Sequence, residues 1–137
     1  MSTFDVFTVA GSGMSAQSVR LNTVASTLAN AESVSTDPSQ VYRAKHPVFQ
    51  AATSTNGNKA STAVNVLGIT ESTAAPDSRY DPGNPLANSD GYVYSPNVNV
   101  VEEMADMISA SRSYQNDVEV MNSARNMLLD TLKLGQS

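Results

Sequence analysis

The segment with the clearest potential for ligand chemistry lies near the N-terminus, between Gly11 and Ala16. It follows the strand-like run FDVFTVA and matches G-x-G-x-x-A, and Glu32 stands about 20 residues downstream, where a dinucleotide-binding domain has its ribose-binding acid. The context argues against that function, because residues 32–38 are a turn-rich loop and no strand pattern completes a βαβ unit. A small dinucleotide-binding domain stays an alternative. The simpler interpretation is that small residues at 10–13 let a neighbouring helix pack closely.

The other residues that could do chemistry are dispersed. His46 is the only histidine, with no nucleophile pattern around it and no second histidine to share a metal. Asp77, Asp81 and Asp90 fall among turn residues, where side-chain bonds to the backbone account for them. The absence of cysteine excludes disulfides, thiol catalysis and thiolate metal sites. We therefore expect no enzyme activity, no metal or other cofactor, and no small-molecule substrate.

Composition narrows the possible partners. The net charge is −5 and the eight basic residues form no cluster, which counts against nucleic acid and against an anionic membrane surface. No apolar run is long enough to span a bilayer. The N-terminus lacks a positive segment and carries Asp5 among its apolar residues, so we expect no cleavable signal peptide. Tryptophan is absent and much of the apolar content is alanine and valine, so we expect no dense core.

The C-terminal segment 99–135 is the longest periodic stretch, with no proline and no glycine before Gly135. A helix of this length would measure about 50 Å. Asn99 is placed to cap its start, and Lys133 with Gly135 forms a typical stop. Its apolar stripe alternates in steps of four and three, as a heptad does, and consists of Val100, Met104, Met107, Ser111, Tyr114, Val118, Met121, Arg125, Leu128 and Leu132.

A second segment, 2–31, has the same spacing and predicts a helix from an N-cap at Ser2 to Asn30. Its stripe consists of Phe4, Phe7, Gly11, Met14, Ser18, Leu21, Ala25 and Leu28. Between the two helices, 41–52 reads as a strand interrupted at Pro47, and Asn56-Gly57 as a hairpin turn. A second strand is predicted over 63–70 with a bulge near Gly68, a loop over 71–91, and a short third strand over 92–94.

The predicted fold class is therefore α+β, with terminal helices forming an antiparallel, coiled-coil-like pair around a small β-rich insert. We expect two domains, a helical one from 1–31 and 99–137 and a central one from 32–98. Two helices cannot cover both stripes, because Val24, Val101, Ile108 and Leu129 lie beside the seam and widen it. The stripe is therefore interpreted as an assembly surface consisting of Phe4, Phe7, Met14, Leu21, Leu28, Val100, Met104, Met107, Ile108, Tyr114, Val118, Met121, Leu128 and Leu132.

Short motifs along nearly the whole chain resemble the bacterial flagellar rod and hook proteins. They are MSAQ at 14–17, RLN at 20–22, ASTLANA at 25–31, YRAK at 42–45, YDPGNP at 80–85, GYV at 91–93, PNV at 96–98, EM at 103–104, SASRSYQ at 109–115 and LKLG at 132–135. Thr27 stands where the family usually has asparagine. The usual threonine-proline-glycine-tyrosine continuation is replaced by ESVST at 32–36. That departure is typical of a proximal rod member of the family.

The resemblance implies a structural subunit of the basal-body proximal rod, required for flagellum assembly and motility. Such proteins pass unfolded through the flagellar type III export apparatus and polymerise into a hollow tube across the periplasm. Their terminal helices line the tube as a coiled-coil inner domain. The implied partners are further copies, other proximal rod proteins, the rod-base adaptor and the distal rod protein. The alternative within this class of assembly proteins is another type III-exported coiled-coil protein, such as a needle or tip component.

Overall fold

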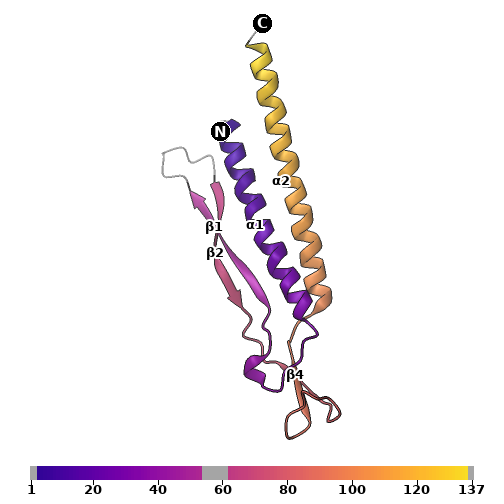
Figure 1. The fold of residues 1–137 in the computed structure, drawn as a ribbon. Helices are drawn as coiled ribbons and strands as arrows, with labels where there is room; N and C mark the ends of the chain where they lie inside the picture. Colours follow the sequence, from indigo (N-terminus) through magenta and orange to yellow (C-terminus); the bar gives the residue numbers. More distant parts are fainter. Residues whose placement is uncertain (1–2, 54–61, 136–137) are drawn as a thin grey trace.

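The computed structural model describes residues 3–53 and 62–135, and it confirms the α+β class with a helix at each end of the chain (Figure 1). Two long helices lie side by side, and two small antiparallel sheets come between them in sequence. The elements in order are α1 (Thr3–Asn30), the 3-10 helix η1 (Pro38–Gln40), β1 (Lys45–Thr53), β2 (Thr62–Glu71), β3 (Asp77–Tyr80), β4 (Tyr92–Ser95) and α2 (Val100–Leu134).

The ends of α2 are fixed as its sequence predicts. The Asn99 side chain accepts hydrogen bonds from the backbone N–H groups of Val101 and Glu102. Glu102 and Glu103 place negative charge in the first turn, where the helix dipole favours it. The Gly135 N–H donates to the Thr131 carbonyl and ends the helix. The N-cap predicted at Ser2 lies outside the described residues.

The two helices run antiparallel and contact each other through small side chains. Ala10, Ala16 and Val24 are buried on α1, and Ala110 and Ala124 on α2. A buried or half-buried residue recurs every seven positions on α2, at 103, 110, 117 and 124. An ion pair of 2.7 Å between Arg20 and Asp106 joins the helices beside this contact. Because α2 is longer, its C-terminal turns extend beyond the start of α1 (Figure 1).

The hairpin β1–β2 lies along α1, on the side away from α2 (Figure 1). Its strands pair antiparallel, and Leu67 is an extra residue, since Val48 stands opposite Gly68 and Phe49 opposite Val66. This confirms the predicted bulge. Two hydrogen bonds attach the hairpin to α1: the Val64 N–H donates to Ser12 Oγ at 3.0 Å, and the Lys45 N–H to Thr27 Oγ1 at 3.4 Å. The predicted Asn56-Gly57 turn lies outside the described residues.

The second sheet corrects the prediction of an unbroken loop over 71–91. β3 pairs with β4 from Asp77 opposite Ser95 to Tyr80 opposite Tyr92. All four residues of β3 are exposed, so no hydrophobic alternation marks it as a strand. The rings of Tyr80 and Tyr92 meet edge to face, with centroids 5.3 Å apart. Gly91 has φ +82, and a Cβ there would lie 2.7 Å from the Tyr80 ring, so the turn into β4 requires glycine.

Candidate assembly surface

The fourteen residues predicted to form an assembly surface all belong to the described part of the chain, and none of them is buried within it. Six are exposed, namely Phe4, Val100, Met104, Met107, Ile108 and Leu132. The other eight are half-buried, namely Phe7, Met14, Leu21, Leu28, Tyr114, Val118, Met121 and Leu128. A single chain therefore leaves a row of large apolar side chains partly or wholly in contact with solvent.

The contact between α1 and α2 is offset from the predicted stripes. The buried positions of α2 are Glu103, Ala110 and Ala124, which lie beside the stripe. Small residues occupy the centre of the contact because they let the two helix backbones approach closely. The larger stripe residues lie at the rim of the contact. Val24, which was expected beside the seam, is fully buried in it. Val101, by contrast, is 75% exposed, as expected.

Most of the exposed large apolar residues of α2 form two groups towards its ends, and Val120, which is 48% exposed, lies between them. The basal patch, at the start of α2, consists of Val100, Val101, Met104, Met107 and Ile108. The distal patch, at its end, consists of Met127, Leu129, Leu132 and Leu134. Exposed polar side chains such as Gln115, Asn122 and Asn126 lie between them. Groups of exposed apolar side chains often mark surfaces that bind other proteins.

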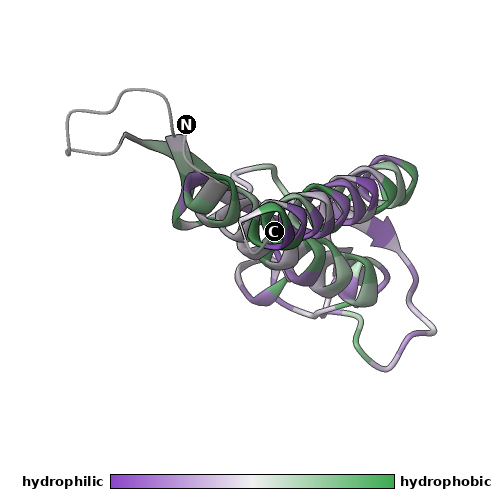
Figure 2. Cartoon of the chain, turned by 90° about the horizontal axis from the view of Figure 1, so that it is seen from above, coloured by the Kyte–Doolittle hydropathy of each residue, from purple (hydrophilic) through white to green (hydrophobic). Residues whose placement is uncertain are grey.

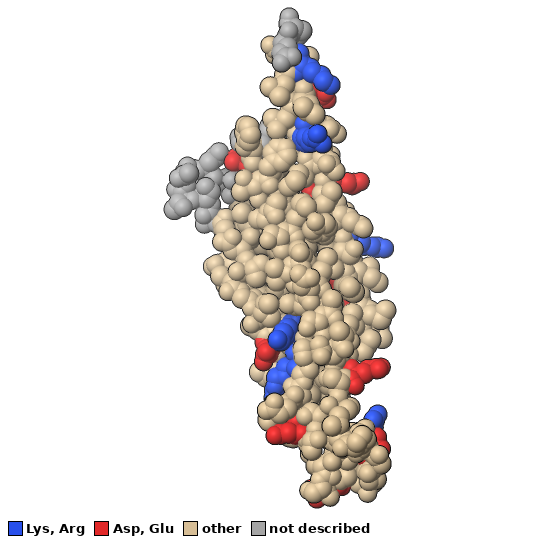
Figure 3. Space-filling model, in the orientation of Figure 1, with Lys and Arg blue, Asp and Glu red and all other residues tan. Residues whose placement is uncertain are grey.

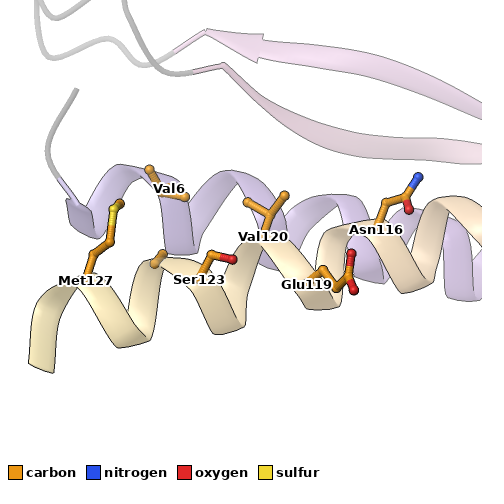
Figure 4. A pocket seen from close by; sticks show the side chains of 7 residues that line it. Val6, Asn116, Glu119, Val120, Ser123 and Met127 are labelled. Carbon is orange, nitrogen blue, oxygen red and sulfur yellow. The ribbon is translucent and has the colours of Figure 1, made fainter.

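Each patch borders a groove between the helices. Beside the basal patch, a groove of about 410 Å³ is lined by Leu21, Met107, Ile108, Ser111 and Arg112. Towards the distal patch, a groove of about 460 Å³ has Val6 of α1 on one side and Val120 and Met127 of α2 on the other (Figure 4). Both are open and largely apolar, so each can receive side chains from another helix.

Charge is sparse over this surface. On the face in Figure 3 the charged side chains lie mainly towards the two ends and leave a largely uncharged area in the middle. In the view along the molecule, hydrophobic and hydrophilic segments are interleaved along both helices (Figure 2). A long, weakly charged surface is suited to packing against other helices and not to holding an ionic ligand.

The glycine motif has a packing role. Gly11 and Gly13 lie inside α1, where the backbone N–H groups are used by the helix, so the strand-turn-helix context of a dinucleotide site is missing. A Cβ at Gly13 would lie 2.7 Å from Oδ2 of Asp117, and one at Gly11 would lie 3.8 Å from Cε of Met121. Gly13 therefore admits Asp117 of α2 closer to α1 than a Cβ would allow, as the packing interpretation predicts, whereas the contact at Gly11 is an ordinary one.

The remaining candidate residues do not come together. His46 is exposed on β1. Asp77 belongs to β3 and not to a turn, which corrects the prediction, while Asp81 pairs with Arg79 at 3.5 Å. The side-chain bonds that shape the turns come instead from Asp37, Asn84 and Asn88. The bond from the Ser39 N–H lowers the pKa of Asp37. Within residues 3–53 and 62–135 no three potential metal ligands of the His, Cys, Asp or Glu types are grouped.

A buried threonine that sequence reasoning missed connects three elements. Thr27 is 0% exposed, and its Oγ1 donates to the Thr23 carbonyl at 3.0 Å while accepting from the Lys45 N–H. It also lies 3.3 Å from the Tyr42 hydroxyl, which lies 3.2 Å from Ser26 Oγ. On a helix of mostly small polar residues nothing distinguishes this threonine from exposed ones.

In the part of the chain that the structure describes, no helix is long and apolar enough to cross a membrane.

Comparison with known proteins identifies the family to which the two terminal helices belong. A model described as "Flagella basal body rod protein" matches residues 7–34, and one described as "Flagellar basal body rod FlgEFG protein C-terminal" matches residues 89–134. These regions contain most of α1 and α2, the two helices that carry the exposed stripe. The chain thus has the terminal helices of the flagellar basal-body rod proteins.

Curated relatives define the group more narrowly. The chain is 49% identical to the flagellar basal-body rod protein FlgC of Salmonella typhimurium, over 99% of this chain and 100% of the relative. It is 50% identical to FlgC of Escherichia coli O6:H1 and 35% identical to FlgC of Bacillus subtilis, with the same coverage. The chain belongs to the FlgC family of flagellar basal-body rod proteins. It is a structural rod subunit of the flagellar basal body.

Proposed function

We propose that this chain builds the proximal part of the rod and polymerises through its terminal helices, without catalysing a reaction. The observation that carries the proposal is the row of large apolar side chains that a single chain leaves uncovered, above all the basal and distal patches of α2. Covering such side chains with neighbouring subunits would gain about 25 cal/mol for each Å² of apolar area removed from water. Helix-on-helix packing between subunits is the simplest way to cover them.

In this proposal residues 1–31 and 99–137 form the inner helical domain of a hollow shaft across the periplasm, and residues 32–98 face outward. The partners are further copies, other proximal rod proteins, the rod-base adaptor and the distal rod protein. The chain reaches the basal body through the flagellar type III export apparatus, without a cleavable signal peptide. The small side chains of the α1–α2 contact support this route, because such a contact holds the chain together only weakly and is easily undone for export.

Ile108→Asp tests the role of the basal patch. Ile108 is 57% exposed, so the substitution leaves the isolated chain folded, but assembly would bury an unpaired charge at a cost of several kcal/mol. The matched control is Asn122→Asp, which adds the same charge at an exposed polar position of α2. In a strain lacking its own copy, we expect the control to restore swimming. The Ile108→Asp variant should give no swimming and no completed rod.

Circular dichroism of both purified variants shows whether they keep the helix content of the unmodified chain. Normal swimming with Ile108→Asp would refute the assignment of the basal patch to an interface. Equal loss of swimming in both variants would also refute it, because the effect would then come from added charge alone.

A further inference from the structure

A buried carboxyl group lies where the base of α2 meets α1. Glu103, in the first turn of α2, is 7% exposed, and its Oε2 has no hydrogen-bond partner among the described residues. The ion pair between Arg20 and Asp106 fixes the antiparallel register of the two helices. Because Glu103 lies one turn before Asp106 on α2, it faces the part of α1 that lies one turn beyond Arg20. This part of α1 contains the fully buried Val24 and Thr27. Oε2 of this carboxyl group is therefore covered by packed side chains.

The charged and titratable groups near this position come from the elements packed around it. They are Arg20 of α1, Tyr42 and Lys45 at the entry to β1, His46 of β1, and Glu102 and Asp106 of α2. Arg20 is bound by Asp106, and Lys45 by Glu71 at 3.6 Å. Burial raises the pKa of Glu103, the charge of His46 opposes that rise, and Asp106 and Glu102 add to it. No cation is held against the buried oxygen in the described chain.

We propose that Glu103 makes the closure of the helix pair pH-dependent, so that the base of α2 is held tightly on α1 when Glu103 carries a proton and more loosely when it is ionised. The physical reason is that an ionised carboxylate without a partner is costly to bury, whereas the neutral acid is not. This inference concerns the free subunit and stands whether or not the apolar patches mediate assembly.

The sign of the effect follows from the direction of the pKa shift. Because the pKa of Glu103 is raised in the folded chain, folding takes up a proton. The stabilisation is complete below the ordinary pKa of glutamate and is lost as the pH rises through the raised value. The helix pair should therefore be more resistant to unfolding in mildly acidic solution.

Thermal unfolding of the full chain carrying Glu103→Gln provides the test, with Glu102→Gln as the matched control. Both variants remove one negative charge from the first turn of α2 and lose a similar interaction with the helix dipole, but only Glu103 is buried. At about pH 8 we expect Glu103→Gln to raise the unfolding midpoint by about 3–5 °C. This gain in the unfolding midpoint should shrink towards zero at about pH 4, where Glu103 of the unmodified chain carries a proton. Glu102→Gln should leave the midpoint unchanged or lower it slightly at both pH values.

A midpoint that falls in Glu103→Gln at about pH 8, or a gain that is the same at both pH values, would overturn the proposal. Carboxyl carbon NMR of the unmodified chain gives a second readout that does not depend on any variant folding. We expect Glu103 to titrate above the ordinary pKa of glutamate. A midpoint for Glu103 at or below that ordinary value would equally overturn the proposal.

Discussion

Replacing Gly13 by alanine measures how closely α2 approaches α1. An alanine in a helix interior is favoured over glycine by about 1 kcal/mol, so the substitution would stabilise an isolated helix. In the folded chain the new Cβ would lie 2.7 Å from Oδ2 and 3.1 Å from Cγ of Asp117, and one of the groups must move. Overpacking of this kind costs about 1–3 kcal/mol. We therefore expect Gly13→Ala to be between neutral and about 2 kcal/mol destabilising.

Gly11→Ala is the internal comparison, because the same substitution two residues earlier meets only Cε of Met121 at 3.8 Å, an ordinary contact. It should stabilise the chain by about 1 kcal/mol, which raises the unfolding midpoint by several degrees. The assay is thermal unfolding followed by circular dichroism, with the two single variants measured side by side.

A double-mutant cycle assigns the difference to one contact. Combining Gly13→Ala with Asp117→Ala removes the carboxylate that the new methyl group would meet. The cycle should return a favourable coupling of about 1–3 kcal/mol. If Gly13→Ala stabilises the chain as much as Gly11→Ala, then the Asp117 carboxylate moves aside at no cost and the expected requirement for glycine at position 13 is refuted.

Two further substitutions test the attachments of the helices. Thr27→Val keeps the shape of the buried side chain but leaves the part-buried Lys45 N–H without this hydrogen bond, so the free energy of unfolding should fall by about 1–3 kcal/mol. The control is Thr8→Val, which removes an exposed hydroxyl that also donates to a carbonyl four residues earlier and should have little effect. Equal losses of unfolding free energy in the two variants would contradict the role of Thr27. Asn99→Ala removes the cap of α2 and should cost about 1 kcal/mol, seen as faster amide exchange at Val101 and Glu102. Unchanged exchange there would show that the cap is dispensable.

The fold could be predicted from the sequence wherever periodicity was strong. The heptad spacing of 99–135 and the cap at Asn99 placed α2 almost to the residue, and the alternation over 63–70 with Gly68 placed β2 and its bulge. β3 was missed because DSRY has no alternation and no hydrophobic residue besides Tyr80, and it becomes a strand only by pairing with β4. Its stability comes from a tertiary contact that local pattern does not record.

The candidate surface was predictable in part for a related reason. Spacing identified which face of each helix is apolar, but it could not say which neighbour that face meets. The contact between α1 and α2 uses Ala10, Ala110 and Ala124, because small residues allow the closest approach of two backbones. Hydrophobicity alone ranks the stripe of Met, Leu and Val above these alanines. Sequence reasoning therefore missed the small residues at the centre of the contact between α1 and α2.

The small side chains between α1 and α2 have a mechanical consequence. No buried apolar residue in the described chain is larger than valine, so one subunit pulled along its axis has little packing with which to resist separation of its helices. A shaft that transmits torque through such subunits would owe its torsional stiffness to contacts between chains. Weakening the contacts within a subunit should then change how readily the shaft is built far more than how stiff it is once complete.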